Sequence, residues 1–311
     1  MPSWLARAKT RAVHWLHAAV VEVEELRLGR EVRIEPGVEI RCRRLVLGDG
    51  VVIRAGTRIE MTDLVIGDYT VINQHCFLSG TGWCRLGHNC WIGHYSVIDS
   101  IGTTWIGDNV GVGAHSQLWT HAYFGDVLEG CNFASQRPLV IEDDVWLVGH
   151  CIVTPIRAAR RSMAMVGSVV TRDMEENRVY AGVPAKDLTE RFGPQFTARP
   201  TAERRAMLEA HLRTYYERAN PRQRRLAIVD QFDPARPEIT QFSLGERRYL
   251  KHLYPEEVGF MRYLLPTKAK FLPDAGSDWV GEHLRPGPPV ARSPDGSHPP
   301  GDASHGAARG A

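Results

Sequence analysis

The chain has 311 residues, 43% hydrophobic and 24% charged, which is enough to bury one sizeable core and a smaller second unit. Its net charge of +2 argues against nucleic acid as an obligate partner, since proteins that neutralise phosphate backbones are markedly basic. We find no transmembrane run and no signal-peptide pattern, which favours a cytoplasmic location. The six cysteines lack paired spacing and predict reduced, packed thiols.

The first expected element is an amphipathic helix over residues 4–23, within an N-terminal segment that we place at residues 1–25. Apolar residues fall on one helical face, and Arg7, Lys9 and Arg11 lie off it. Two interpretations stay open. The helix either caps the open end of the core that follows, or it makes peripheral contact with the inner face of a membrane, because tryptophans opposite basic residues suit an anionic lipid surface.

A six-residue repeat follows, and neither a helical period nor a strand period explains it. Its apolar anchors form triplets that begin 19 or 20 residues apart until an interruption: Leu28, Ile34, Ile40; Leu47, Ile53, Ile59; Ile66, Ile72, Leu78; Leu86, Ile92, Ile98; Ile106, Val112, Leu118; then Ile141, Leu147, Val153. Each interval thus contains three hexapeptides and one or two additional residues. This length suggests that each triplet forms one coil of a three-sided solenoid.

The fourth residue after each anchor supports this interpretation, because a position near the solenoid axis accepts only small side chains. That slot holds Val32, Val38, Val51, Thr57, Thr70, Cys76, Gly82, Cys90, Ser96, Gly102, Val110, Ser116, Ala122, Val145 and Cys151. Glycine or a short polar residue follows many anchors, where corners need unusual backbone angles. The sequence therefore predicts a mainly β fold, a parallel β-helix over residues 26–192 with a projecting loop at 122–138.

Beyond the repeat the pattern changes. TAERRAMLEAHLRTYYERAN predicts a helix capped by Thr201, PEEVGFMRYLL a second helix, and RRLAIVDQF a strand between them. We assign residues 193–284 to an α-rich C-terminal appendage. Residues 285–311 are rich in proline and glycine, which predicts a disordered tail.

The repeat, together with IEDDVWLVGH, GSVVTRDM and VYAGVPAKDLT, resembles the hexapeptide-repeat acyltransferases, especially the galactoside, maltose and nodulation O-acetyltransferase branch. The resemblance covers roughly residues 28–192. It implies a left-handed β-helix, against the usual right-handed crossover. It also implies a homotrimer with sites at subunit boundaries, and acetyl transfer from acetyl-CoA, without a metal, to a hydroxyl of a sugar or glycan precursor.

The resemblance nominates His121, in LWTHAYFGD, as the catalytic residue. Transfer from a thioester to a hydroxyl requires removal of the hydroxyl proton, and a histidine with an ordinary pKa of about 6.5 suits this general-base role. One alternative is that His121 is a surface corner histidine, since His75, His115 and His150 hold equivalent corner positions. The other is that His115, one hexapeptide earlier, is the catalytic residue. The loop beside His121 is expected to govern acceptor specificity.

Except for His94, the remaining site residues also come from the resemblance. Asp99 and His94 are expected to contact the acceptor, and Trp146 either walls the acyl slot or packs. Coenzyme A is expected along Gly149, Val166, Thr171, Arg172 and Lys186, because its phosphates need positive charge nearby. Arg172 and Lys186 could equally be solvated charges.

One departure concerns the seventh coil. The family usually reads PGVTIGDGAVVGAGSVV, whereas Pro155-IRAARRSMAMV-GSVV is one residue shorter and lacks the glycines. We therefore expect an irregular coil over residues 155–166. Its cluster Arg157, Arg160 and Arg161 either grips an anion or faces solvent, and solvent is favoured.

Three alternatives to O-acetylation stay open. An N-acetyltransferase acting on an amino or nucleotide sugar would use similar histidine chemistry. A carbonic-anhydrase-like protein would bind zinc through histidines of adjacent coils, such as His75, His94 and His115, although that branch's GHxxxxH spacing is absent. A non-catalytic scaffold would have its function in residues 200–275.

Overall fold

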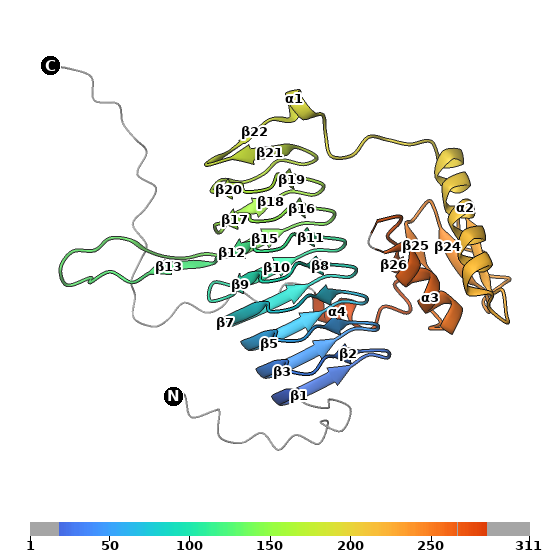
Figure 1. The fold of residues 1–311 in the computed structure, drawn as a ribbon, viewed down its shortest axis with the longest axis horizontal. Helices are drawn as coiled ribbons and strands as arrows, with labels where there is room; N and C mark the ends of the chain where they lie inside the picture. The colour runs from blue at the N-terminus through green and yellow to red at the C-terminus, as the bar shows by residue number, and fades with distance from the viewer. Residues whose placement is uncertain (1–18, 266, 285–311) are drawn as a thin grey trace.

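The computed structural model describes residues 19–265 and 267–284, and a stack of parallel strands dominates it (Figure 1). These strands are β1 (Val20–Leu28), β2 (Arg33–Ile34), β3 (Glu39–Leu47), β4 (Val52–Ile53), β5 (Arg58–Ile66), β6 (Val71–Ile72), β7 (Phe77–Leu86), β8 (Trp91–Ile92), β9 (Val97–Asp99), β10 (Thr104–Ile106), β11 (Gly111–Val112), β12 (Gln117–Leu118), β15 (Leu139–Ile141), β16 (Trp146–Leu147), β17 (Ile152–Val153), β18 (Arg157–Ala158), β19 (Met163–Ala164), β20 (Val169–Val170) and β21 (Val179–Gly182), to which β22 (Ala185–Asp187) adds antiparallel. The predicted β-helix of hexapeptide repeats is confirmed.

Most of the predicted N-terminal helix and the whole predicted disordered tail lie outside the described residues. The predicted C-terminal end of that helix is wrong, because residues 20–25 belong to strand β1. Val21 and Val23 are buried and Glu22 and Glu24 are exposed. This period-two alternation is typical of a strand and outweighs the helical spacing of the apolar residues.

Coils stack in register, so each anchor lies beside the equivalent anchor of the next coil. Ile72 pairs with Ile92, and Ile98 pairs with Leu78 on one side and Leu118 on the other. All five side chains are 0% exposed. Two expected inward positions are wrong: Leu28, in the lowest described coil, is 43% exposed, and Ala122 is exposed because the chain leaves the solenoid there.

The cysteines of the repeat are free and buried, as predicted. The Cys76 thiol lies 3.1 Å from the Gly93 carbonyl oxygen, and the Cys90 thiol lies 3.1 Å from that of Gly107. Burial raises the pKa of Cys76 to about 11 and that of Cys90 to about 12. Both thiols therefore stay protonated at neutral pH and fill the small inward slot.

The cross-section changes along the stack. In the lower coils β1, β3, β5 and β7 run through two faces as single strands of nine or ten residues. Above β7 the sheet divides into the column β9-β12-β17-β20 and the column β10-β15-β18. This division creates a corner, between β9 and β10 and between β12 and β15, which we call the hairpin corner.

The seventh coil, expected to be irregular, is complete. Arg157 pairs with Val140, Met163 with Trp146, and Val169 with Ile152. Arg161 adopts the left-handed corner conformation with φ 61°. The missing glycine is therefore replaced by a non-glycine residue that accepts this conformation.

The arginine cluster of that coil is engaged with neighbouring coils. Arg157 Nε donates to Glu142 Oε1 at 2.7 Å, and Arg160 Nη2 donates to Glu176 Oε1 at 2.8 Å. These ion pairs are exposed and link one coil to the next, so the interpretation of the cluster as surface charge is favoured over an anion grip.

A second corner, the acidic corner, joins coils through side chains; it consists of Asp49, Asp68, His88, Asp108 and Asp143. The Asp49 amide donates to Asp68 Oδ1 at 2.8 Å, and the Asp108 amide donates to Asp143 Oδ1 at 2.8 Å. His88 fills one rung, because its Nδ1 accepts from the Asp68 amide at 3.0 Å. Each coil thereby satisfies a backbone N–H of its neighbour.

The C-terminal unit, residues 193–284, mixes helices and strands. After α1 (Thr189–Phe192) it contains α2 (Thr201–Ala219), α3 (Pro255–Leu264), α4 (Gly281–Leu284) and a sheet of β23 (Leu226–Val229), β24 (Thr240–Ser243), β25 (Arg248–Tyr249) and β26 (Leu272–Pro273). Both helices and the strand predicted from the sequence are confirmed, although Thr201 begins the helix and makes no cap. Among the described residues, none of the helices has the length and apolar character needed to span a membrane.

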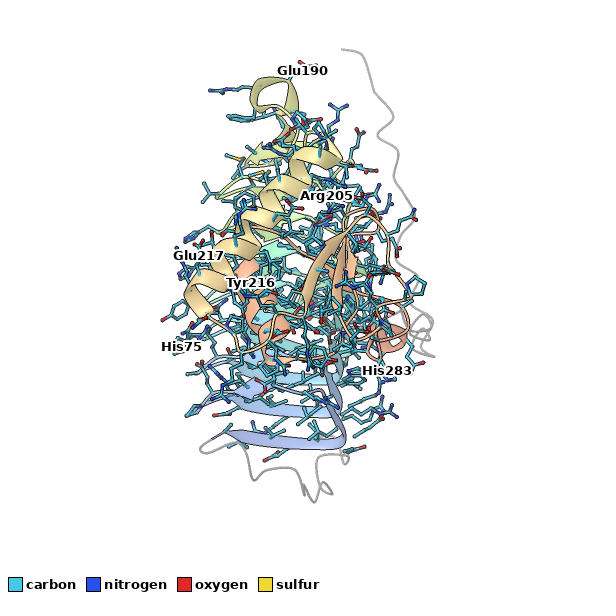
Figure 2. All side chains as sticks on the ribbon, turned by 90° about the vertical axis from the view of Figure 1, so that its right-hand side faces the viewer. His75, Glu190, Arg205, Tyr216, Glu217 and His283 are labelled. Carbon is cyan, nitrogen blue, oxygen red and sulfur yellow. The ribbon has the colours of Figure 1, made fainter. Side chains whose placement is uncertain are left out.

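This unit docks on the acidic corner. Lys251 Nζ lies 2.7 Å from Asp49 Oδ2 and 2.7 Å from Asp68 Oδ2, and the three side chains are 4%, 3% and 1% exposed. Tyr69, a corner residue of the solenoid, packs into the apolar core of the C-terminal unit. Figure 2 shows the unit in front of the solenoid, with α2 running from Arg205 to Glu217 and His75 and His283 toward opposite sides.

Lys251 is therefore expected to be a main determinant of stability. Lys251→Ala leaves two buried carboxylates without a counter-charge, and should lower the free energy of unfolding by about 3–5 kcal/mol. Denaturant unfolding monitored by circular dichroism measures this, with Arg222→Ala, at an exposed position of the same unit, as the control. A loss no greater than that of the control would contradict the account.

The ion pairs of Lys251 with Asp49 and Asp68 also predict that the folded state loses stability at alkaline pH. Burial lowers the pKa of Lys251, but Asp68 and Asp49 raise it overall above its ordinary 10.5. A group whose pKa is higher in the folded state stabilises fully below its unfolded pKa and ceases to do so as pH rises through its folded pKa. Wild type should lose stability above about pH 10.5 more steeply than Lys251→Ala. If both proteins lose stability equally steeply at alkaline pH, the ion pairs of Lys251 do not stabilise the folded state.

Candidate active site

At the hairpin corner a projecting loop interrupts the solenoid. Within the predicted loop 122–138 and just before it, β13 (His121–Tyr123) pairs antiparallel with β14 (Ala134–Gln136). The base is tied to the corner, because the Arg137 amide donates to the Thr120 carbonyl at 2.9 Å and Gln136 Nε2 to the Ile101 carbonyl at 2.9 Å. The hairpin leaves the solenoid on the side opposite to the C-terminal unit (Figure 1). His121, its first residue, is thereby held on the rigid core.

Asp99 organises this corner. It ends β9 and is 2% exposed. Its Oδ2 accepts from the Thr120 amide at 2.9 Å, from the Thr120 hydroxyl, and lies 2.9 Å from His121 Nδ1. The Thr120 hydroxyl in turn accepts from the Gly102 amide at 2.9 Å. One buried carboxylate oxygen thus fixes both the backbone before His121 and the imidazole itself.

These contacts select the tautomer of His121. Because an ionised carboxylate only accepts hydrogen bonds, Nδ1 carries the proton. Nε2 then has a free lone pair, and the side chain is 22% exposed, so this nitrogen can receive a proton from a bound molecule. The arrangement meets the geometric requirement for a general base, with Asp99 as the residue that orients it.

Two aromatic rings flank the imidazole. Tyr123 lies with its ring centroid 4.9 Å from that of His121 at a 52° tilt. Trp119 lies 6.4 Å away and meets it edge-on, with Nε1 donating to Gln117 Oε1 at 3.2 Å. The sequence reasoning did not single out Thr120, Trp119 or Tyr123. The alternation in the quoted string LWTHAY, which places every second residue on one side of an extended chain, could have found the two rings.

His94 lies at a different corner from His121. The aromatic corner, made by His75, Tyr95, His115 and His150, carries a stack of rings with centroids 5.0, 5.0 and 4.8 Å apart. His94 precedes Tyr95 and is exposed. The structure therefore does not bring His94 to Asp99 and His121, and its contact with an acceptor stays a prediction.

The conceivable metal stack of His75, His94 and His115 is wrong, because Tyr95 occupies the ring position between His75 and His115. Within residues 19–265 and 267–284 there is no group of three or more histidine, cysteine, aspartate or glutamate side chains that could hold a metal ion. The stacked rings instead occupy left-handed corner positions, with φ of 50–59°.

Four of the five residues expected to bind coenzyme A border one face, the column β12-β17-β20. Gly149 and Val166 lie on its aromatic-corner side, where the Gly167 amide donates to the Gly149 carbonyl at 2.9 Å. Thr171 and Arg172 follow β20 on the hairpin-corner side. His121 follows β12 on the same side, and β17 lies between β12 and β20 in the stack. His121, Thr171 and Arg172 thus share one side of the column.

Trp146 and Lys186 lie on the neighbouring nine-stranded sheet. Trp146, in β16, is 47% exposed beside Gly111, where an added Cβ would lie 3.1 Å from the indole. Lys186, in β22, is exposed opposite Ala181. The structure therefore spreads the predicted residues over two adjacent faces of the solenoid instead of gathering them in a single cleft.

No family model matches the sequence. A 114-residue stretch is 35% identical to the Saccharomyces cerevisiae protein named "Putative acetyltransferase YJL218W", and it covers 33% of this chain and 57% of that protein. The chain thus spans little more than half the length of this curated relative.

Solved structures with similar coils include three acyltransferases. The N-acyltransferase AntD from Bacillus cereus, in complex with dTDP and 3-hydroxybutyryl-CoA, is 15% identical with a TM-score of 0.38, over 63% of this chain and 93% of that one. The hexapeptide-repeat acetyltransferase VCA0836 from Vibrio cholerae, complexed with acetyl-CoA, is 21% identical with a TM-score of 0.29, over 49% and 69%. A maltose O-acetyltransferase from Clostridium difficile is 19% identical with a TM-score of 0.28, over 53% and 68%.

The contact between Asp99 and His121 predicts a defined tautomer. In nitrogen-15 correlation spectra of the neutral imidazole, Nδ1 should carry the proton in wild type. Asp99→Ala removes the acceptor, so the Nε2-protonated form should become the major one, as in free imidazole side chains. An unchanged tautomer in Asp99→Ala would show that Asp99 does not orient His121. His75→Ala is the control, because His75 belongs to the aromatic corner.

Proposed function

We propose that this chain is an acyl-CoA-dependent acyltransferase, and more specifically an O-acetyltransferase that acts on a hydroxyl of a sugar or glycan precursor. The observation that carries the proposal is the oriented imidazole of His121, with a free Nε2 beside a projecting hairpin. The sequence similarity to a yeast protein named as an acetyltransferase supports the same reaction class.

The proposed mechanism uses His121 as general base. Its Nε2 takes the proton of the acceptor hydroxyl while the acceptor oxygen attacks the thioester carbonyl. The C–S bond then breaks, the acetyl group stays on the acceptor oxygen, and the coenzyme A sulfur receives the proton from the imidazolium. No covalent acyl-enzyme is needed, because the acceptor attacks directly.

Asp99 acts in this mechanism by holding and stabilising the imidazolium. Its carboxylate lies 2.9 Å from Nδ1, where the positive charge develops. Asp99 Oδ2 already accepts from the Thr120 amide and hydroxyl. Orientation of His121 is therefore better supported than the acceptor contact expected from the resemblance.

Acetyl-CoA is proposed to lie along the column β12-β17-β20, between Gly149 and Val166 on one side and Thr171 and Arg172 on the other. Arg172 is exposed and can meet a phosphate without first breaking a buried ion pair. The seventh coil is regular, so these positions are presented on a continuous face. Lys186, in β22 beyond the last coil, would meet the far end of the coenzyme.

We propose a homotrimer because the resemblance to the hexapeptide-repeat acyltransferases implies one. Exposed apolar side chains support this proposal. The hairpin exposes Phe124, Val127, Leu128 and Phe133, and the coil faces expose Phe77, Trp91, Trp146 and Ile152. The C-terminal unit covers the opposite side of the solenoid (Figure 1). Sedimentation equilibrium should therefore give three times the chain mass of 34.8 kDa, and a monomer would contradict this part.

An amine acceptor is the second candidate. The same Nε2 could take a proton from an attacking amine nitrogen, and no described contact distinguishes oxygen from nitrogen. Oxygen is preferred because the quoted motifs resemble the O-acetyltransferase branch. Competition between matched hydroxyl and amino sugars in one assay separates the two candidates.

His121→Ala is the direct test of the catalytic proposal. Acceptor-dependent release of coenzyme A thiol, followed with a thiol reagent across a panel of glycosides and amino sugars, should fall by about 10²–10⁴-fold. The melting temperature should stay close to that of wild type, because the side chain is part-exposed. His75→Ala, which removes an exposed histidine at the aromatic corner, should leave the rate unchanged. Equal rates in wild type and His121→Ala would exclude His121 as the base.

A further inference from the structure

The aromatic rings beside His121 have no role in the proton transfer. Tyr123 is 50% exposed, yet its ring contacts the imidazole. Trp119 is partly buried and its indole is held by Gln117. Both rings lie beside the His121 imidazole, with ring centroids 4.9 Å away for Tyr123 and 6.4 Å away for Trp119.

The spacing follows from an extended backbone. Trp119, His121 and Tyr123 are alternate residues, and β13 begins at His121. Alternate residues of an extended chain point to one side, whereas Thr120 is buried toward Asp99. The base and the two rings thus form one row, with an imidazole in the middle.

Such a row suits a ring-shaped acceptor. A pyranose has a C–H face, which carries partial positive charge, and a rim of hydroxyls. The face of an aromatic ring carries partial negative charge, so it attracts the C–H face and leaves the hydroxyls pointing sideways. With Tyr123 4.9 Å from His121, a sugar ring lying against Tyr123 directs a rim hydroxyl toward Nε2.

We propose that Tyr123 is a specificity-determining residue that selects a cyclic sugar acceptor by stacking, with Trp119 as the opposite wall of the same subsite. This inference rests on the proposed acetyl transfer, because it concerns the acceptor side of that reaction. An acyclic polyol offers similar hydroxyls but no C–H face, so it is accepted poorly.

The test compares Tyr123→Ala with two matched variants. Tyr123→Phe keeps the ring, and Met207→Ala removes a 45% exposed apolar side chain of α2, in the C-terminal unit on the other side of the solenoid. Thiol release from acetyl-CoA is measured with methyl pyranosides and with sorbitol as the acyclic probe. Tyr123→Ala should lower kcat/KM for the pyranoside by about tenfold, mainly through acceptor KM. Tyr123→Phe and Met207→Ala should stay within about twofold of wild type.

Several results would overturn the inference. If Tyr123→Ala raises KM for acetyl-CoA and leaves that of the acceptor unchanged, the ring serves the donor. If it changes the sedimentation mass, the ring belongs to a contact between copies. If wild type uses sorbitol as well as pyranosides, no ring is selected. A wild type that transfers no acetyl group to any acceptor overturns the proposed function and this inference together, whereas an active enzyme indifferent to Tyr123→Ala overturns this inference alone.

Discussion

The structure depends on one constraint: every coil must stack in register on the next at the spacing of paired parallel strands. That spacing leaves room at inward positions for only an anchor such as Ile92 and a small residue such as Cys90, both with almost no exposed surface. The same constraint builds columns at the corners, where one side chain per coil meets its equivalent. Aromatic rings stack at one corner, and carboxylates accept neighbouring amides at another.

The C-terminal unit uses the acidic corner as its docking site. The carboxylates there are fixed by the backbone of adjacent coils, so Lys251 meets two acceptors that need no reordering. At His88, the one position of the column that is not a carboxylate, the C-terminal unit supplies Asp278, whose carboxylate lies 3.4 Å from His88 Nε2. Charge complementarity along the corner thus fixes the unit to one side of the solenoid and leaves the hairpin side free.

The candidate site lies where the stacking is interrupted. Asp99 ends a strand of the stack, and the next coil leaves the solenoid just beyond Thr120. The carboxylate that closes the corner also orients His121, so the geometry of the proposed base follows from the fold. The hairpin beyond it is free to vary without disturbing the coils.

Much of this could be predicted from the sequence, because the six-residue period records the stacking directly. The anchors and small slots were readable in this way, apart from Leu28 and Ala122, and the projecting loop followed from the interruption of the period. The helices from Thr201 and Pro255 were predicted from local sequence patterns outside the repeat. The seventh coil was misjudged, since Arg161 adopts a corner conformation that suggested a need for glycine. Residues 20–25 were misjudged because helical and strand periods overlap there.

Contacts between distant segments could not be predicted. The pairing of Lys251 with Asp49 and Asp68 joins residues about 200 apart in the chain, and no local pattern marks it. His121 was nominated by resemblance, but its link to Asp99 depends on how two coils align. His94 and Tyr95 are adjacent in sequence, and only the corner geometry decides that Tyr95 joins the ring stack.

The most direct test of the central claim is the melting temperature of the purified full chain with and without saturating acetyl-CoA, in wild type and in His121→Ala. A ligand that binds only the folded state raises the melting temperature. We expect a clear rise of similar size in both proteins, since His121 moves a proton during the reaction and is not among the residues proposed to hold the coenzyme. No rise in either protein would contradict acyl-CoA-dependent chemistry on this solenoid.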